Sequence, residues 1–413
     1  MFGNLASVAT LMLSTLLMMA GYGLMNYMLP IRGLAEGWST FTISIIATGY
    51  TFGFTSSCVV TPTLVQRVGH VRVFSALITL LTVSVLLCAL VVDWRAWTLF
   101  RAIAGFAIAG CYLIIESWLN ERSNNDNRGA FFSVYMITTL AGSIGGQFIV
   151  PLGDPQTVTL FIVCALIFSA ALFPTALSTA QSPAPLNQAR FDLKKLYRRS
   201  PVAFIGSLLS GALSGTWSSL GAVYSQRVGL TTTEGATLLA CVLAGGALAQ
   251  LPIGRLSDRM DRRKVMVAAG LFGTLCCIIM IILGGISPLA LYICSFFVGT
   301  VLYPVYSLNV AHANDLAEPD EYVTISSAIM ILYGLGTVTG PLLTGALMEQ
   351  IGPTGLLWSL AISFLMYAGY AGWRMTQRIA PDDDPHKTEF QSLPLPLRGT
   401  DVASSVRTDT PSA

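Results

Sequence analysis

The sequence predicts an all-α membrane protein in which twelve transmembrane helices form two pseudo-symmetric six-helix bundles. Three observations carry this prediction: an apolar composition, an internal repeat and a one-sided distribution of basic residues. Hydrophobic residues make up 54% of the 413 residues and charged residues 11%, and the mean hydropathy is +0.67. Soluble domains usually carry about 25% charged residues. Most of the chain is therefore expected to lie in lipid.

The repeat relates the two halves of the chain by one offset of 192 residues. Seven pairs of identical or similar residues share this offset: Gly23 and Gly215, Gly37 and Gly229, Gly53 and Gly245, Leu64 and Leu256, Arg67 and Arg259, Arg72 and Lys264, and Gly142 and Gly334. A parallel duplication of this size in an apolar chain is typical of a transporter whose two bundles face each other across a substrate pathway.

The spanning helices follow from apolar windows of roughly 20 residues, the length that crosses a bilayer. The N-terminal bundle, residues 1–178, is expected to contain six of them, at 5–29, 39–63, 73–92, 96–119, 130–151 and 157–178. The C-terminal bundle, residues 201–378, is expected to contain six more, at 202–224, 233–254, 264–284, 288–312, 322–348 and 354–375. No basic region precedes the first window and no small-residue cleavage site follows it, so it is expected to be a helix and not a removable signal peptide.

Two segments depart from the apolar pattern. Residues 179–200 are rich in Pro, Gln, Lys and Arg, with one short amphipathic piece, and are expected to form a cytoplasmic linker between the bundles. Residues 379–413 combine acidic, Pro and Ser/Thr residues with almost no aromatic ones. Such a composition cannot bury enough apolar surface to fold, so we expect a disordered cytoplasmic tail.

The basic residues orient the helices. Of the 23 Lys and Arg residues, 19 fall on one side of the predicted membrane, and only four fall elsewhere: Arg32, Arg95, Arg101 and Arg227. Basic loops stay in the cytoplasm. The sequence therefore predicts a multi-pass protein of the plasma (inner) membrane with both termini and the linker in the cytoplasm.

Several other classes of function lack their signatures. All eight cysteines fall inside predicted spans, where thiols act as small apolar packing groups, so no disulfide frame, metal site or cofactor is predicted. The net charge of +2 is explained by topology and gives no sign of nucleic-acid binding. The phosphate loop of ATP-driven pumps and the motifs of membrane hydrolases are missing from the sequence. An enzyme is not expected.

The segment from Gly254 to Lys264, with sequence GRLSDRMDRRK, places an acid beside several bases at a helix end. Such groups can form a charge-assisted network that stabilises one conformation. The segment resembles the loop signature of the major facilitator superfamily, although Asp261 stands where that family usually has Gly. In the first half, Gln66 replaces the acid Asp258. The predicted gate and conformational network comprises Gln66, Arg67, Arg72, Glu116, Arg128, Gly254, Asp258, Arg259, Arg262 and Arg263.

Arg101 begins a second segment that resembles the same superfamily, an Arg followed by small residues through Gly105 and Gly110. An ionisable residue within an apolar span usually marks a functional site. The alternative is that Arg101 extends to the outer interface near Trp94 and Trp97.

Glu116, near the inner end of the same window, has two interpretations as well. It is either a gate partner for a nearby arginine or a proton acceptor whose pKa burial would raise.

Further matches point to one branch of the superfamily. They comprise Glu116 to Asn120, Arg128-Gly129 with Tyr135, Gln147, Leu251 to Leu256, and Leu302 to Val305. Together they resemble the YcaD-type branch. The resemblance implies two six-helix bundles that transport a solute by alternating access, without a cofactor, and a monomer in the lipid bilayer.

The resemblance also implies a central cavity lined mainly by helices 1, 4, 7 and 10. The candidate substrate-binding residues there are Asn26, Arg101, Tyr112, Gln147, Trp217, Ser218, Gln250, Tyr303, Tyr306, Asn309 and Tyr333, with Tyr22 and Ser214 beside them. Aromatic faces with one cation and several amides or hydroxyls suit an amphiphilic or anionic small molecule. Each aromatic residue could instead serve helix packing.

The function predicted is therefore secondary active transport of a small organic solute by alternating access, coupled to a proton or another ion, with export favoured. Import of a small metabolite or organic anion is the alternative for direction. A non-transporting membrane sensor on the same scaffold is a third hypothesis, which a large folded cytoplasmic domain or a degenerate second half would favour. The sequence shows neither feature.

Overall fold

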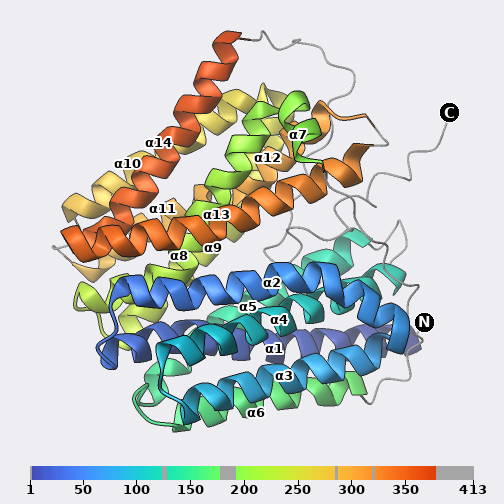
Figure 1. Ribbon diagram of the computed structural model, residues 1–413. Helices are drawn as coiled ribbons and strands as arrows, with labels where there is room; N and C mark the ends of the chain where they lie inside the picture. The colour runs from blue at the N-terminus through green and yellow to red at the C-terminus, as the bar shows by residue number, and fades with distance from the viewer. Residues whose placement is uncertain (1, 123–127, 177–191, 284–286, 319–320, 378–413) are drawn as a thin grey trace. The chain divides into compact units, whose positions relative to one another are not determined.

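The computed structural model describes residues 2–122, 128–176, 192–283, 287–318 and 321–377, and within these ranges every regular element is helical (Figure 1). The chain divides into two compact units, residues 1–188 and residues 189–413. The predicted linker is described only from residue 192 onward, and the predicted disordered tail, 379–413, lies outside the described residues.

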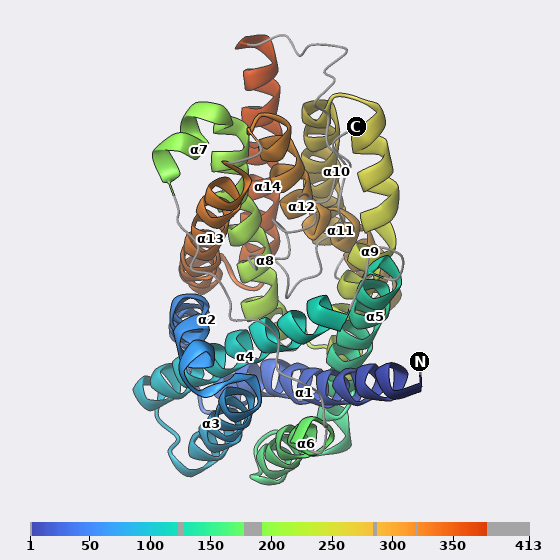
Figure 2. The ribbon, with the colours of Figure 1, turned by 90° about the vertical axis from the view of Figure 1, so that its right-hand side faces the viewer.

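The first unit contains six long helices and one short 3-10 turn. They are α1 (Phe2–Ala35), α2 (Thr40–Val68), α3 (His70–Leu90), α4 (Trp94–Arg122), α5 (Arg128–Gln147), the 3-10 turn η1 (Val150–Leu152) and α6 (Thr159–Ala176). Helix α4 packs along α2 and α3, and α1 packs along α5 and α6 (Figure 2). Helix α1 also contacts α2 and α4, so polar groups of these three helices can meet inside this unit.

The second unit repeats that pattern after one extra short helix. Its elements are α7 (Leu193–Arg199), α8 (Pro201–Arg227), α9 (Thr232–Arg259), α10 (Arg262–Leu283), α11 (Pro288–Leu302), α12 (Pro304–Asp315), α13 (Tyr322–Ile351) and α14 (Thr354–Gln377). Helix α8 packs along α13 and α14, and α9 packs along α11, as α1 and α2 do with their partners. The sequence repeat thus corresponds to a repeat of helix packing.

The window predicted at 288–312 consists of two helices. Helix α11 ends at Leu302 and α12 begins at Pro304, with Tyr303 between them. Proline has no backbone N–H and its ring clashes with the carbonyl four residues earlier, so it interrupts a helix. The two pieces still follow one another as one apolar span, Pro288–Asp315.

Each of the twelve predicted windows is helical, but the structure confirms the spanning length and hydropathy for ten of them. Among the described residues, ten helices are long and apolar enough to cross a membrane. Helix α6 is a shorter apolar helix, Thr159–Thr175. Helix α8 is long, but its many Ser and Gly residues lower its hydropathy, and most of its residues are buried against neighbouring helices.

The repeated glycines have two structural roles. Gly37 and Gly229 have φ of 76° and 83° in the turns before α2 and α9, a region of φ that favours glycine. Gly53 on α2 lies against the backbone of Ala102 on α4, and Gly245 on α9 lies against that of Phe296 on α11. A Cβ atom at either position would meet a carbonyl oxygen. The second pair therefore lets paired helices approach closely, as small residues do in membranes.

Helix α7 is the amphipathic piece of the predicted linker, and it packs on the second unit. Leu196 is fully buried in a cluster with residues of α8, α12 and α13. Lys195 Nζ lies 2.8 Å from the Glu321 carboxylate, and Arg199 Nη2 lies 3.0 Å from it. Burial would raise the pKa of Glu321, but the hydrogen bonds from Lys195 and Arg199 outweigh burial and lower this pKa to about 2. Both apolar and ionic contacts thus hold α7 against the second unit.

Candidate functional site

The first candidate site is the Arg101 cluster, which we define as Tyr22, Asn26, Tyr50 and Arg101. Arg101 on α4 is only 6% exposed. Its Nη2 donates a hydrogen bond to Asn26 Oδ1 on α1 at 3.0 Å. The carbon of its guanidinium lies 4.5 Å from the centroid of the Tyr50 ring on α2. One cation therefore joins three helices of the first unit.

A row of aromatic rings continues from this cluster along α2 and α4. The Tyr50 centroid lies 6.1 Å from those of Tyr22 and Phe54, and the Phe54 centroid lies 6.5 Å from that of Tyr112. The Tyr112 hydroxyl donates to Met19 Sδ at 2.7 Å. The predicted site residues Asn26, Arg101 and Tyr112 thus belong to one aromatic region of the first unit.

Tyr50 and Phe54 were missed by the analysis of the sequence. Two signals could have found them. They are four residues apart, so they lie on one face of a helix, and Tyr50 lies opposite Gly105, whose missing side chain lets α4 approach the Tyr50 carbonyl. Finding them required knowing that α2 and α4 are partners.

The geometry favours a functional interpretation of Arg101 over an extension to the interface. Its guanidinium is turned toward Asn26 and Tyr50. Trp97, the aromatic residue one turn earlier, instead donates from its ring to the carbonyls of Cys88 and Val91 at 3.1 and 2.8 Å.

Glu116 lies on α4, 1% exposed, and accepts a hydrogen bond from the hydroxyl of Tyr135 on α5 at 3.3 Å. Arg67 and Arg72 are exposed, and among the described residues neither forms an ion pair. The side chain of Arg128 lies outside the described residues. Both interpretations of Glu116, gate partner and proton acceptor, therefore stay predictions.

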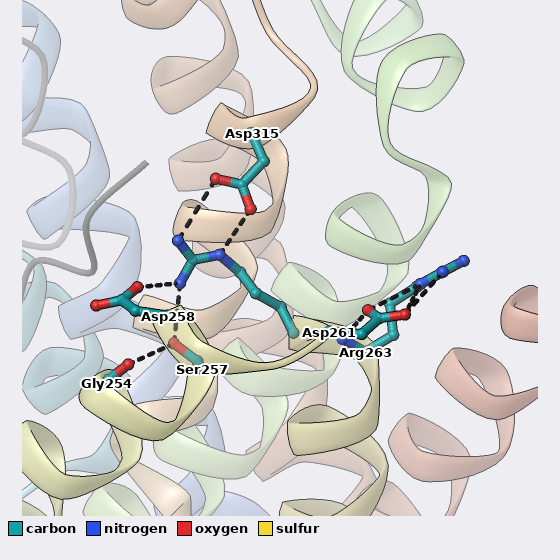
Figure 3. Close-up of polar contacts among 7 residues, drawn as sticks. Gly254, Ser257, Asp258, Asp261, Arg263 and Asp315 are labelled. Carbon is teal, nitrogen blue, oxygen red and sulfur yellow. Dashed lines mark hydrogen bonds and ion pairs between the residues drawn. The ribbon is translucent and has the colours of Figure 1, made fainter. Parts of the chain in front are cut away.

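The second candidate site is the α9–α10 network, drawn in Figure 3, which we define as Ser257, Asp258, Arg262 and Asp315. Arg262 is 2% exposed and lies between the carboxylates of Asp258 and Asp315. Its Nε donates to Asp315 Oδ2 at 2.7 Å, and its Nη1 donates to Asp258 Oδ1 and to Ser257 Oγ, both at 2.9 Å. Asp315 is the last residue of α12. The network therefore fastens the ends of α9, α10 and α12 to one another.

Two further contacts hold the turn itself. The Ser257 hydroxyl donates to the Gly254 carbonyl at 2.8 Å, and Arg263 Nη2 lies 2.8 Å from Asp261 Oδ2 (Figure 3). The backbone N–H of Arg263 also donates to Asp261 Oδ1, at 2.9 Å. Burial would raise the pKa of Asp261, but the hydrogen bonds from Arg263 outweigh burial and hold this pKa below its usual range. Asp261, in place of the family's usual glycine, thus caps and pairs with the start of α10.

The structure brings together Gly254, Asp258 and Arg262 of the predicted network. Arg259 is exposed and forms no ion pair among the described residues. Asp315 was missed, although an acid at the end of a predicted span could have suggested a partner for the basic turn. The structure places Gln66 at the equivalent turn of the first unit, exposed to the surroundings.

The remaining candidate binding residues of the second unit lie in several environments. The Tyr306 and Tyr333 ring centroids are 4.8 Å apart, in an edge-to-face arrangement between α12 and α13. Gln250 Nε2 donates to Ser307 Oγ at 3.4 Å. Tyr303 is 8% exposed at the break between α11 and α12, where its ring packs against Gly246 of α9.

Asn309 and Trp217 are packed within helix interfaces, whereas Ser218 is exposed. Asn309 is fully buried and accepts a hydrogen bond from the Tyr367 hydroxyl at 3.2 Å. Trp217 is 2% exposed, and the Ser218 hydroxyl donates to the carbonyl of Gly215, one turn earlier, at 3.2 Å. In the first unit, Gln147 is 8% exposed near the end of α5. These contacts differ from the Arg101 cluster, in which one cation joins three helices.

Comparison with known proteins agrees with this architecture. Residues 11–335 and 203–409 match the sequence pattern of the Major Facilitator Superfamily. An MFS-type transporter of Yersinia pestis (strain Pestoides F) is 24% identical over 381 residues, which cover 88% of this chain and 93% of that protein. The MFS-type transporter YcaD of Escherichia fergusonii is 23% identical over 365 residues, covering 87% and 93%. These relatives confirm the resemblance to the YcaD-type branch.

A solved structure extends the comparison to the fold. The nucleoside transporter NupG is similar with a TM-score of 0.72 at 15% identity, over 90% of this chain and 98% of that chain. At this identity the similarity establishes a shared fold. With its apolar spanning helices, two compact helical units and family pattern, the chain is an integral membrane protein, a transporter and not an enzyme, and it belongs to the Major Facilitator Superfamily.

Proposed function

We propose that this transporter is a secondary active one, which moves a small organic solute across the plasma membrane by alternating access and is driven by an ion gradient. The observation that carries the proposal is the Arg101 cluster. A cation within a spanning bundle is costly, and such residues mark substrate or ion pathways. Arg101 meets an amide and aromatic rings there, which are groups suited to an organic solute.

The α9–α10 network supports the alternating-access part of the proposal. Arg262 links the ends of three helices through two carboxylates. Ion-pair networks at helix ends can stabilise one of two conformations, because they must break before the helices separate. We assign this network the role of holding one conformation closed on its own side of the membrane.

The proposed orientation places that side in the cytoplasm, together with both termini and the linker. Its support is the one-sided distribution of 19 of the 23 basic residues. Reporter fusions at Pro185 and Pro385 are expected to show cytoplasmic behaviour, with high activity of a cytoplasmic reporter and low activity of an exported one. An external signal from either fusion would contradict this orientation and the even number of spans between the two sites.

The direction that we propose is export, and import of a small metabolite or organic anion is the second candidate. The test compares metabolite levels inside cells and in the medium for cells that express the wild type or Arg101→Ala at equal protein level. Export predicts a compound that is enriched in the medium and depleted in cells only with the wild type, and import predicts the reverse. Arg101→Lys keeps the charge but loses the planar fork, so partial activity is expected. Identical profiles for wild type and Arg101→Ala would contradict the role of Arg101.

A further inference from the structure

We infer that the Arg101 cluster binds the anionic group of an organic acid, whose apolar or aromatic body packs on the tyrosine rings beside it. The inference rests on the proposed function, because it names the class of solute that would be moved. Its basis is a buried cation that contacts polar and aromatic groups, but no acid, among the described residues of the first unit.

The charge of Arg101 has no counter-ion among the described residues of its unit. An arginine remains protonated in proteins, and a buried charge is strongly unfavourable unless it is paired. Among the described residues, Arg101 forms no ion pair, whereas Arg32 and Arg227 are paired with Glu36 and Glu349. The neutral Asn26 amide and the Tyr50 ring reduce the cost of burial, but neither carries a negative charge.

Acids on the same helix are too far away to serve as the counter-ion. Glu116 is 15 residues further along α4, which corresponds to roughly 22 Å at about 1.5 Å per residue. Asp93 precedes the start of α4, and its carboxylate accepts hydrogen bonds from the backbone of Arg95 and Ala96 at 2.9 and 3.0 Å. Asp93 thus caps the helix.

The guanidinium also retains hydrogen-bonding capacity. Its Nη2 donates to Asn26, whereas its Nη1 is buried and has no hydrogen-bond partner among the described residues. An unsatisfied buried donor is unfavourable. A carboxylate accepts from the two nitrogens of a guanidinium in a planar, charge-assisted pair. An organic acid would therefore satisfy both the missing hydrogen bond and the missing charge.

The surroundings of Arg101 favour an acid with an apolar or planar body over a bare inorganic anion. Tyr22, Asn26 and Tyr50, which lie around the nearly buried cation, are themselves partly exposed. The aromatic row continues through Phe54 to Tyr112. Flat apolar groups bind well against such rings, with ring centroids about 4.5–7 Å apart.

The second unit does not duplicate this chemistry. The repeat places Ile293 at the position of Arg101, Val242 at that of Tyr50 and Ser218 at that of Asn26. Ile293 is 50% exposed. The cation belongs to one half of the repeat only, so each molecule is expected to bind one acidic group at this position. The interior-negative membrane potential drives a net negative charge outward, which agrees with the proposed export.

The experiment measures the melting temperature of the purified full chain with organic acids and their primary amides. The pairs are benzoate and benzamide, indole-3-acetate and indole-3-acetamide, and octanoate and octanamide, and sodium chloride and benzylamine serve as further probes. A ligand at ten times its Kd is expected to raise the melting temperature by about 2 °C. We expect at least one acid to reach this rise while its amide, chloride and benzylamine do not.

Arg101→Met tests whether this rise comes from the proposed site. It removes the charge but keeps a long apolar side chain, so its ligand-free melting temperature is expected to equal or exceed that of the wild type while the acid no longer raises it. Arg101→Lys is expected to weaken binding at least about tenfold through loss of the planar fork. Arg95→Met is the matched control: Arg95 is exposed on the same helix, beside Trp94, and the acid should still stabilise this variant fully.

Several results would overturn the assignment. One is that no acid raises the melting temperature more than its amide does, or that chloride or benzylamine raises it equally. Another is that the acid still raises the melting temperature of Arg101→Met. A third is that Arg101→Met without ligand melts at a lower temperature than the wild type, which would make the cation a structural element. Failure of this inference is distinguishable from failure of the proposed function. If the metabolite comparison still finds a neutral or cationic compound moved by the wild type, the transporter assignment stands and only the substrate class is wrong.

Discussion

The turn between α2 and α3 and the turn between α9 and α10 occupy equivalent places in the two units but are held by different chemistry. In the second unit, Arg262 lies buried between Asp258 and Asp315. The repeat places His70 at the position of Arg262, and its Nε2 shares a 3.2 Å hydrogen bond with the Ser117 hydroxyl on α4. The His70 ring also lies 6.0 Å from the Trp118 ring.

This comparison shows that the duplication has preserved backbone features more strictly than side-chain chemistry. Gly53 and Gly245 make equivalent close contacts between helices, whereas the positions of Asp258 and Asp261 hold Gln66 and Gly69 in the first unit. A buried ion-pair network that loses one member leaves uncompensated charges. A neutral contact that is lost leaves a smaller penalty. The second turn is therefore expected to be far more sensitive to substitution.

The largest effect is expected from Arg262→Met, which removes the shared cation and leaves Asp258 and Asp315 facing each other. We expect destabilisation of about 3 kcal/mol, typical of breaking a buried ion pair, together with loss of transport. The matched variant in the first unit, His70→Leu, should cost about 1 kcal/mol. Thermal unfolding of both purified variants measures the difference. Equal losses would show that the two turns do not differ energetically.

A smaller effect is expected from Glu321→Gln, which tests the charged contact between α7 and the start of α13. The pKa of Glu321 is lowered in the folded state to about 2, so its contribution is present above its unfolded pKa of about 4.3 and is lost as the pH falls toward 2. We expect the variant to be about 2 kcal/mol less stable at pH 7. Melting temperatures from pH 7 to pH 3 should converge on acidification, and a constant difference would contradict the ionic contact.

Asp258→Asn is expected to have a moderate effect on stability, about 1 kcal/mol, because Arg262 keeps its closer contact with Asp315 and Asp258 is partly exposed. Transport should nevertheless fall several-fold without loss of membrane insertion, since the proposed closed conformation is weakened. Uptake or efflux measured at equal protein level checks this expectation. Full transport activity in Asp258→Asn would mean that the motif only helps to orient the helices in the membrane.

The smallest effect is expected from Gln66→Asp, which introduces the missing acid into the first turn. Gln66 is exposed and His70 is not a fixed cation, so stability should change by less than about 0.5 kcal/mol and transport by less than about twofold. A large gain or loss in either measurement would mean that the first turn takes part in a charged contact comparable to the α9–α10 network.

The sequence by itself determined the features that depend on residues close together in the chain. Hydropathy located each of the twelve helical windows, because a membrane-spanning helix is formed by one continuous run of apolar residues. The repeat offset identified the duplicated units, and its glycines correspond to turns with positive φ and to close helix contacts. The contact between Asp258 and Arg262 spans four residues, so the motif alone contained both partners.

Only the tertiary structure decided which distant residues meet. Arg101 and Asn26 are separated by 75 residues and Arg262 and Asp315 by 53, and their contacts depend on which helices pack together and how each is rotated about its axis. Composition and periodicity are local and carry little of that information. For the same reason Tyr50 was missed beside Arg101, and Asn309, a candidate for solute binding, lies fully buried against Tyr367.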